Sequence, residues 1–237
     1  MADAAAAGAD ARWLVDGVKR RLVVFGAKQI AEVCAFYFDH DSDYEVVAFT
    51  VDGEFLDAGT FAGRPVVPYE EIARSHPPDR HDLFVAVSYQ KMNRVRAAKY
   101  ESARAIGYRL AHYVSSKAFT WPTLSVGDNT FVMEANVVQP FATIGSDTIL
   151  WSGNHIGHHS RIGSHCFLAS HIVVSGGVEV GDHCFIGVNA TLRDGIHVAE
   201  RCLIGAGVTL LKDTQPEEVY AATATEPGRV PSSRIRL

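Results

Sequence analysis

Histidine side chains are concentrated in one stretch of the chain, where they are candidates for acid–base chemistry. Seven of the 11 histidines lie in residues 155–197, and the densest part reads NHIGHHS. A neutral imidazole is the natural general base near pH 7 for taking a proton from an amine or a hydroxyl. A base of this kind must be held in one tautomer by a partner. The leading candidate base is His158, and His159, Asn154 or a backbone carbonyl are candidates for its partner.

Other catalytic chemistry has weaker signals in the same stretch. None of the nearby serines lies in a G-x-S-x-G turn, and direct attack on a thioester needs only a base and an oxyanion donor. The gamma-class carbonic anhydrases bind zinc through a distant His followed by a His-x4-His pair. That spacing is absent here, since His155 and His159 are separated by three residues. We therefore expect no metal.

A period of six residues runs through the C-terminal half and must position these histidines. Written in sixes from Val126 to Leu210, all 15 first positions are aliphatic, and seven second positions are Gly. This period is typical of neither an α-helix nor a simple strand, but of a hexapeptide parallel β-helix. The aliphatic side chain points into a triangular core, and three hexads form one coil. The 15 hexads therefore predict about five coils.

Residues 18 apart should stack on consecutive coils. The segments IGSHCF, VGDHCF and VAERCL, which begin at residues 162, 180 and 198, are near copies of one another. Cys166, Cys184 and Cys202 consequently occupy one repeated slot for a small residue, and we interpret them as structural rather than as a metal or redox set.

The N-terminal part alternates strand and helix patterns, which predicts a parallel, Rossmann-like sheet. The expected strands are 21–26, 44–51, 82–88 and 108–115, and the expected helices are 29–37 and 93–106. The predicted divisions are a flexible lead-in (1–18), a Rossmann-like domain (19–120) and a β-helix domain with a C-terminal tail (121–237).

The first strand–helix loop, GAKQ, contains a single glycine, Gly26, so the dinucleotide fingerprint is absent and NAD binding is disfavoured. A phosphate or ribose can still bind beside Gln29, where the helix begins with unpaired N–H groups. Asp52 ends the second strand, at the edge where such sheets bind ligands. Lys91 follows the third strand and is a further candidate for substrate binding.

Composition excludes several classes of function. The chain has 237 residues and a net charge of −5, which argues against broad nucleic-acid binding. No apolar stretch approaches the roughly 20 residues of a membrane helix, so no membrane insertion is expected. The N-terminus has no secretory pattern, and four cysteines without such a signal favour reduced thiols in the cytoplasm.

A short βαβ domain followed by hexapeptide repeats containing GNHIGHHS resembles the bacterial sugar-nucleotide N-acetyltransferases, and among them most the GDP-perosamine N-acetyltransferases. The resemblance covers about residues 20–230. It implies a left-handed β-helix and a homotrimer with acetyl-CoA in the groove between neighbouring β-helices. It also implies that the nucleotide of the sugar docks on the N-terminal domain, and that the pathway is lipopolysaccharide or glycan synthesis.

The resemblance assigns roles to individual residues. His158 matches the base that takes a proton from the sugar amine, and His171 matches a second histidine of the same site. The residue after the base is often an acid in this family, whereas here it is His159, which we also include in the catalytic set. The expected contacts are Gly26, Gln29, Asp52, Lys91, Asn154 and His155 for the nucleotide sugar, and Gly176, Asn189, Gly205, Ala206 and Gly207 for CoA.

The predicted reaction is transfer of the acetyl group of acetyl-CoA to the amino group of a nucleotide-linked 4-amino-deoxy sugar, by direct attack. Two alternatives stay open from the residues alone. The acceptor can be a hydroxyl, as in the sialic acid O-acetyltransferases. The chain can also be a non-catalytic β-helix protein whose small domain binds a nucleotide sugar.

Overall fold

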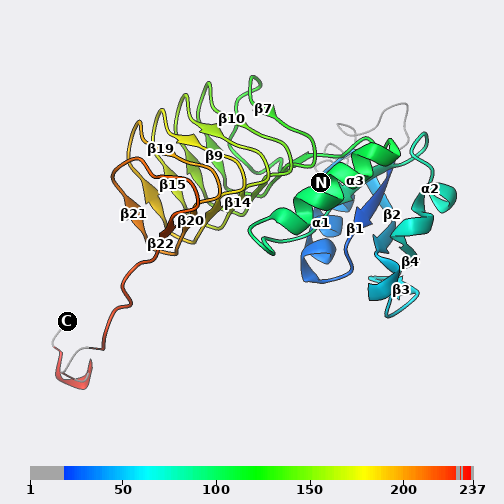
Figure 1. The fold of residues 1–237 in the computed structure, drawn as a ribbon, viewed down its shortest axis with the longest axis horizontal. Coiled ribbons are helices and arrows are strands. Elements are labelled where there is room, and N and C mark those ends of the chain that lie inside the picture. Colours follow the sequence, from blue (N-terminus) through cyan, green and yellow to red (C-terminus); the bar gives the residue numbers. More distant parts are fainter. Residues whose placement is uncertain (1–18, 228–229, 231, 236–237) are drawn as a thin grey trace, which may run out of the picture.

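The computed structural model describes residues 19–227, 230 and 232–235, so the expected lead-in at 1–18 lies outside the described residues. A small α/β domain lies beside a stack of β-helix coils, and the C-terminal segment leaves the last coil (Figure 1). None of the helices in these described ranges has the length and apolar character needed to cross a bilayer.

The α/β domain is built on a five-stranded sheet with the order β3-β4-β2-β1-β5, parallel except for the β3–β4 pair. The interior strand β1 is apolar on both faces because a helix packs on each side of it. Leu22 and Val24 pack with α1, whereas Val23 and Phe25 pack with α3. The elements are β1 (Arg20–Phe25), α1 (Gln29–His40), β2 (Tyr44–Val51), β3 (Thr60–Phe61), β4 (Arg64–Pro68), α2 (Ile72–Ser75), β5 (Asp82–Val85) and α3 (Arg94–Ile106), with 3-10 turns at Gly53–Phe55 and Tyr69–Glu71. A further 3-10 turn, Ser232–Arg234, lies in the C-terminal segment.

Two parts of this domain differ from the sequence prediction. The strands β3 and β4 were not expected, because they are short and are joined by a tight turn at Ala62 and Gly63, both with positive φ. The expected strand 108–115 is reduced to β6 (Tyr113–Val114). It pairs with the β-helix strand β8 rather than with β5, which Leu110 meets through a single bridge at Leu83.

The 15 hexads form 15 two-residue strands, β7 to β21, which stack in parallel register at a spacing of 18 residues. The predicted fold class, an α/β domain followed by a parallel β-helix of hexapeptide repeats, is confirmed. The inward aliphatic side chains form one continuous core, from Val132 to Leu210, against which Val126 packs. Three sheets result, and their outward residues differ in character.

The docked face is the seven-stranded sheet on which the α/β domain packs. Its outward residues Phe131, Ile149 and Phe167 are buried in one cluster with Phe38 of α1. This face therefore joins the two domains through apolar contact. Its strands are β6, β8 (Phe131–Val132), β11 (Ile149–Leu150), β14 (Phe167–Leu168), β17 (Phe185–Ile186), β20 (Leu203–Ile204) and β22 (Val219–Tyr220).

The other two sheets are the polar face and the open face. The polar face presents side chains such as Arg161, Glu179 and His197, and consists of β7 (Ser125–Val126), β10 (Thr143–Ile144), β13 (Arg161–Ile162), β16 (Glu179–Val180) and β19 (His197–Val198). The open face leaves Val137 and Val173 more than one third exposed. It consists of β9 (Val137–Val138), β12 (His155–Ile156), β15 (Val173–Val174), β18 (Thr191–Leu192) and β21 (Thr209–Leu210).

The cysteine slot has a structural role. The thiols of Cys166 and Cys184 are buried, and each donates to the carbonyl 15 residues further on, as the hydroxyls of Thr148 and Ser160 do. Burial raises the pKa of the Cys166 thiol well above its ordinary value, which keeps it protonated and unreactive. Within the part of the chain that the structure describes, no group of three His, Cys, Asp or Glu is arranged to hold a metal ion.

A buried polar cluster fastens α3 to the first coils. The guanidinium of Arg96 is fully buried, with Nε 3.1 Å from Asp147 Oδ1. It also donates to the carbonyls of Val87, Ser88 and Cys166. The carboxylate of Asp147 receives a further hydrogen bond from Asn129 at 2.7 Å and lies 2.8 Å from His165 Nδ1. The two domains are thus held by a charged network as well as by apolar packing.

Candidate functional site

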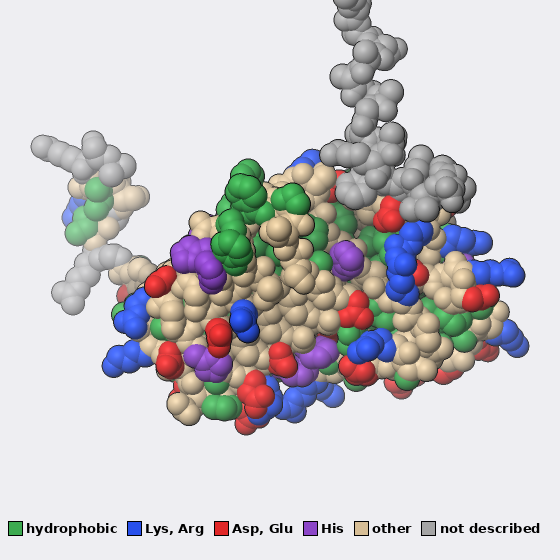
Figure 2. Space-filling view, turned by 90° about the horizontal axis from the view of Figure 1, so that it is seen from above, with side chains coloured by type: hydrophobic (Ala, Val, Ile, Leu, Met, Phe, Trp, Pro, Cys, Tyr) green, Lys and Arg blue, Asp and Glu red, His purple; other side chains and the backbone are tan. Residues whose placement is uncertain are grey.

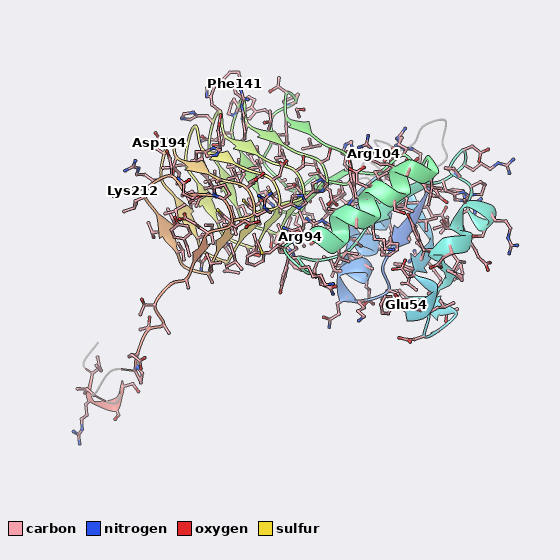
Figure 3. All side chains as sticks on the ribbon, in the orientation of Figure 1. Glu54, Arg94, Arg104, Phe141, Asp194 and Lys212 are labelled. Atoms are coloured by element: carbon pink, nitrogen blue, oxygen red, sulfur yellow. The ribbon has the colours of Figure 1, made fainter. Side chains whose placement is uncertain are left out.

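The predicted histidine base lies at the corner where the open face meets the polar face, which we call the base corner. On consecutive coils this corner carries Phe141, the His158–His159 pair, Gly176 and Asp194. Figure 3 shows Phe141, Asp194 and Lys212 along this edge of the β-helix, and Figure 2 shows histidine side chains exposed on the β-helix surface. The corner is therefore accessible in the single chain.

The two histidines of the base corner contact each other. His158 Nδ1 lies 3.1 Å from His159 Nδ1, and the ring of His159 packs against Phe141 at a tilt of 39°, with centroids 4.7 Å apart. The backbone N–H of His158 donates to Gln139 Oε1 at 2.9 Å. His159 is thus the partner that meets the candidate base, one of the three alternatives that the sequence left open.

This contact has a consequence for the tautomers of the pair. If both rings are neutral, one Nδ1 carries a proton and donates a hydrogen bond, which the other Nδ1 accepts. When His158 donates, its Nε2 is left with a free lone pair and is the basic atom. His159 then carries its own proton on Nε2. The pair can therefore present a basic nitrogen without a neighbouring carboxylate.

The ring of His158 lies directly over Gly176 of the next coil. A Cβ at Gly176 would be 2.6 Å from His158 Cε1 and 2.7 Å from Nε2. The same Cβ would be 3.1 Å from Asp194 Oδ1 of the following coil. Only glycine leaves this space free, and both the basic nitrogen of His158 and the Asp194 carboxylate border it.

The structure places His171 at a different corner, where the docked face meets the open face. Asn189 and the turn Gly205-Ala206-Gly207 stack at this same corner on later coils. His171 sits over Gly153, and the imidazole of His158 lies on the other side of the open face. Within one chain the two histidines are therefore not brought into one site, and their expected grouping requires a neighbouring chain.

His155 and Asn154 lie away from the base corner as well. His155 is half-buried on the open face, in register with Val137 and Val173. Asn154 is 1% exposed, and its amide donates to the Trp151 carbonyl and accepts from the Ile172 N–H. Its side chain is thus used inside the coil and not at the base corner, where the sequence analysis expected it.

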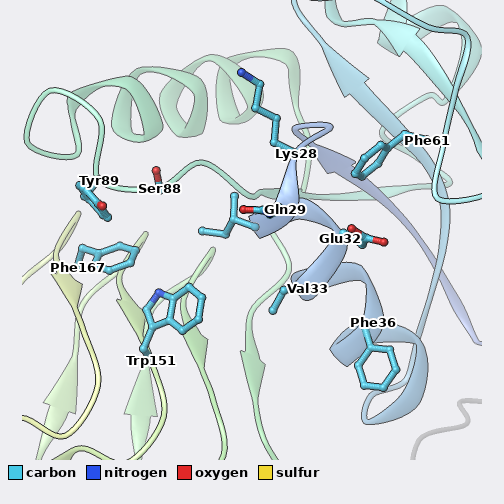
Figure 4. Close-up of a pocket in the computed structure, with 11 residues that line it drawn as sticks. Lys28, Gln29, Glu32, Val33, Phe36, Phe61, Ser88, Tyr89, Trp151 and Phe167 are labelled. Atoms are coloured by element: carbon cyan, nitrogen blue, oxygen red, sulfur yellow. The ribbon is translucent and has the colours of Figure 1, made fainter. Parts of the chain in front are cut away.

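A cleft of about 980 Å³ separates α1 from the docked face. Figure 4 shows Lys28 and Gln29 at the start of α1 facing Tyr89, Trp151 and Phe167 across it. The remaining lining comprises Ile30, Glu32, Val33, Phe36, Phe61 and Ser88. The cleft is thus bounded by the helix N-terminus and by aromatic side chains from both domains.

The other residues predicted in this domain differ in their relation to the cleft. Gly26 has φ 124°, and a Cβ there would lie 2.9 Å from the Ala86 carbonyl oxygen, so the loop requires glycine. The carboxylate of Asp52 pairs with Lys99. Lys91 is exposed in a turn of three consecutive positive-φ residues. Neither Asp52 nor Lys91 lines the cleft.

Several cleft residues were missed from the sequence, among them Lys28, Trp151 and Phe36. A usable signal existed for Trp151, since it occupies a second hexad position, where seven of the 15 hexads have glycine. Lys28 precedes a helix and Phe36 lies on its exposed side, so local sequence gave no sign that another domain faces them.

Comparisons with known proteins agree with this architecture. The family "Bacterial transferase hexapeptide (six repeats)" matches residues 159–194, and "Hexapeptide repeat of succinyl-transferase" matches residues 177–212. Comparison with curated proteins gives no match. Among solved structures, the acetyltransferase domain of PglB from Neisseria gonorrhoeae is 23% identical, with a TM-score of 0.75 over 85% of this chain and 96% of that one.

PerB from Caulobacter crescentus, solved in complex with CoA and GDP-perosamine, is 25% identical with a TM-score of 0.73, over 84% of this chain and 92% of that one. Both similarities extend over the α/β domain and the β-helix. The hexapeptide repeat and the two-part fold are shared with these proteins, and the matches support an acetyl-CoA-dependent acyltransferase.

Proposed function

We propose that this protein transfers the acetyl group of acetyl-CoA to the amino group of a nucleotide-linked 4-amino-deoxy sugar of the GDP-perosamine type. The observation that carries the proposal is the His158–His159 pair, which presents a basic nitrogen over Gly176. The fold is shared with PerB, whose structure holds CoA and GDP-perosamine, and with the PglB domain, which was also solved with acetyl coenzyme A.

In this proposal His158 is the general base of a direct transfer. The amine nitrogen attacks the thioester carbonyl carbon while Nε2 of His158 takes one of its protons. The C–S bond then breaks, and the thiolate of CoA receives the proton from the imidazolium. His159 holds the tautomer that leaves Nε2 free. The products are the acetamido sugar and CoA thiol, and no covalent enzyme intermediate forms.

The separation of the two histidine corners favours a homotrimer in which a neighbouring chain completes the site. In a closed cyclic assembly, the base corner of one chain can face the His171 corner of the next, where the docked face meets the open face. The CoA groove would then have Gly176 on one wall and Asn189, Gly205, Ala206 and Gly207 on the other, with His171 reaching the site from that second wall. The partly exposed Val137 and Val173 of the open face suit such contact.

The nucleotide is proposed to bind in the cleft beside α1. The first turn of a helix presents unpaired N–H groups that suit a diphosphate, and Lys28 lies at this point with Gln29. Aromatic side chains such as Trp151 and Tyr89 offer surfaces for the base or the sugar. Gly26 allows the conformation of the loop before α1. Asp52 and Lys91 do not line the cleft, so they would contact the nucleotide sugar only where it extends beyond the cleft.

The proposal is tested by measuring release of CoA thiol from acetyl-CoA with a panel of GDP-, UDP- and dTDP-linked 4-amino sugars. We expect turnover with one amino sugar and none with its hydroxyl counterpart. Turnover with hydroxyl acceptors alone would identify an O-acetyltransferase. Binding of a nucleotide sugar without any thiol release would identify a non-catalytic protein.

Gly176→Ala is expected to lower kcat by about 10- to 100-fold with little loss of stability. The new methyl group overlaps the His158 ring, which must turn aside, and a displacement near 1 Å at a reacting group can cost about 100-fold. Gly59→Ala is the matched control, since a Cβ at Gly59 meets no atom within 4 Å. Wild-type kcat in Gly176→Ala would contradict this position for the base.

A further inference from the structure

The acceptor-binding part of the base corner includes a carboxylate that the sequence analysis did not select. Asp194 follows His158 by 36 residues and Gly176 by 18, which places the three on consecutive coils. Figure 3 shows Asp194 at the outer edge of the β-helix. Its position is thus set by the repeat that positions the base.

This carboxylate and the base both lie close to Gly176. Asp194 Oδ1 is 3.1 Å, and His158 Nε2 2.7 Å, from the point where a Gly176 Cβ would lie. The two atoms therefore border the same space, one from the coil before the glycine and one from the coil after it. Across the described residues, the Asp194 carboxylate accepts no hydrogen bond and forms no ion pair, so its charge is available to a ligand.

The charge of Asp194 matters because the two histidines of the base corner carry no acidic group. His158 and His159 share one hydrogen bond between imidazoles and provide no negative charge to attract a cation. An aliphatic amine is largely protonated at neutral pH, whereas a hydroxyl is uncharged. A carboxylate beside the base attracts the ammonium form and offers a hydroxyl only a weaker hydrogen bond.

We propose that Asp194 binds the ammonium group of the acceptor over Gly176 and thereby selects an amine rather than a hydroxyl. This inference rests on the proposed acetyl transfer. The ammonium gives one proton to His158 Nε2, which passes it to solvent, and the neutral amine attacks the thioester carbon. As the C–N bond forms and the C–S bond breaks, the nitrogen loses a second proton through His158 to the CoA thiolate. The sum is ammonium plus acetyl-CoA giving amide, CoA thiol and one proton.

The test uses the full-length protein with GDP-perosamine and its 4-hydroxyl counterpart, GDP-rhamnose. Dissociation constants are measured by calorimetry without CoA, and KM and kcat by thiol release. We expect Asp194→Asn to weaken GDP-perosamine binding about tenfold and to leave GDP-rhamnose binding unchanged. Asp194→Glu should restore part of the preference, and the KM for acetyl-CoA should stay at the wild-type value.

Glu179→Gln is the control, since it removes the same charge from an exposed side chain of the polar face. It should leave both dissociation constants unchanged. If Asp194→Asn binds GDP-perosamine and GDP-rhamnose with the same dissociation constants as wild type, the role of Asp194 is overturned. The proposed function survives that result as long as the wild-type protein still releases thiol with an amino sugar. A wild-type protein that releases no thiol with any amino sugar would overturn both.

Discussion

Replacement of His158 by alanine is expected to lower kcat for thiol release by about 10²- to 10⁴-fold, the usual contribution of a positioned general base. The side chain is exposed, and its contacts are with His159 and the surface of Gly176. Its removal creates no cavity in the core, so the fold should be retained. Thiol release gives kcat, and circular dichroism and gel filtration check the fold and assembly.

His197→Ala is a suitable control for this experiment. His197 is also an exposed histidine of the β-helix, but it lies on the polar face beside Glu179. Its loss should leave kcat within a factor of about two, because it contacts neither the base corner nor the cleft. A His158→Ala protein with wild-type turnover would show that another group takes the proton and would remove the main support for the proposed mechanism.

The β-helix was predictable because its sequence code is local and repeated. Each hexad places its own aliphatic residue in the core, and no long-range information is needed to assign a coil. The same arithmetic also shows which side chains stack, since only residues separated by multiples of 18 share a column. His158 and Asp194 satisfy this rule, whereas His158 and His171 are 13 apart. The two histidines can therefore share a site only if a neighbouring chain supplies one of them.

The contacts between domains were not predictable in this way. Trp151 and Lys28 lie 123 residues apart in the chain and line one cleft only because the α/β domain docks on one of three faces. Asn154 resembles a polar loop residue in sequence, yet its amide completes the corner of a coil. The sequence does not show whether a polar residue at a turn bonds the backbone or a ligand. The packing around the side chain decides between the two.

Arg96 is the clearest example of a residue whose role packing decides. An arginine is ordinarily exposed to solvent, but the structure buries Arg96 completely against Asp147. Arg96→Met keeps much of its volume and removes its hydrogen bonds, leaving the Asp147 carboxylate without its main counter-charge. Loss of one partner from a buried ion pair typically costs about 3–5 kcal/mol. We expect a decrease of this size in the free energy of unfolding, measured by urea denaturation at constant protein concentration.

Two further variants separate charge from packing at this cluster. Arg104→Met removes an exposed arginine from the same helix, where it faces Glu101 at 3.9 Å, and should cost less than about 1 kcal/mol. Adding Asp147→Asn to Arg96→Met removes the uncompensated charge, so the double variant should be more stable than Arg96→Met alone. If the double variant is instead less stable, the main contribution of Asp147 is its hydrogen bonds to Asn129 and His165, and the charge on Arg96 is secondary. If Arg96→Met costs no more than Arg104→Met, the apolar docked face alone holds the two domains together.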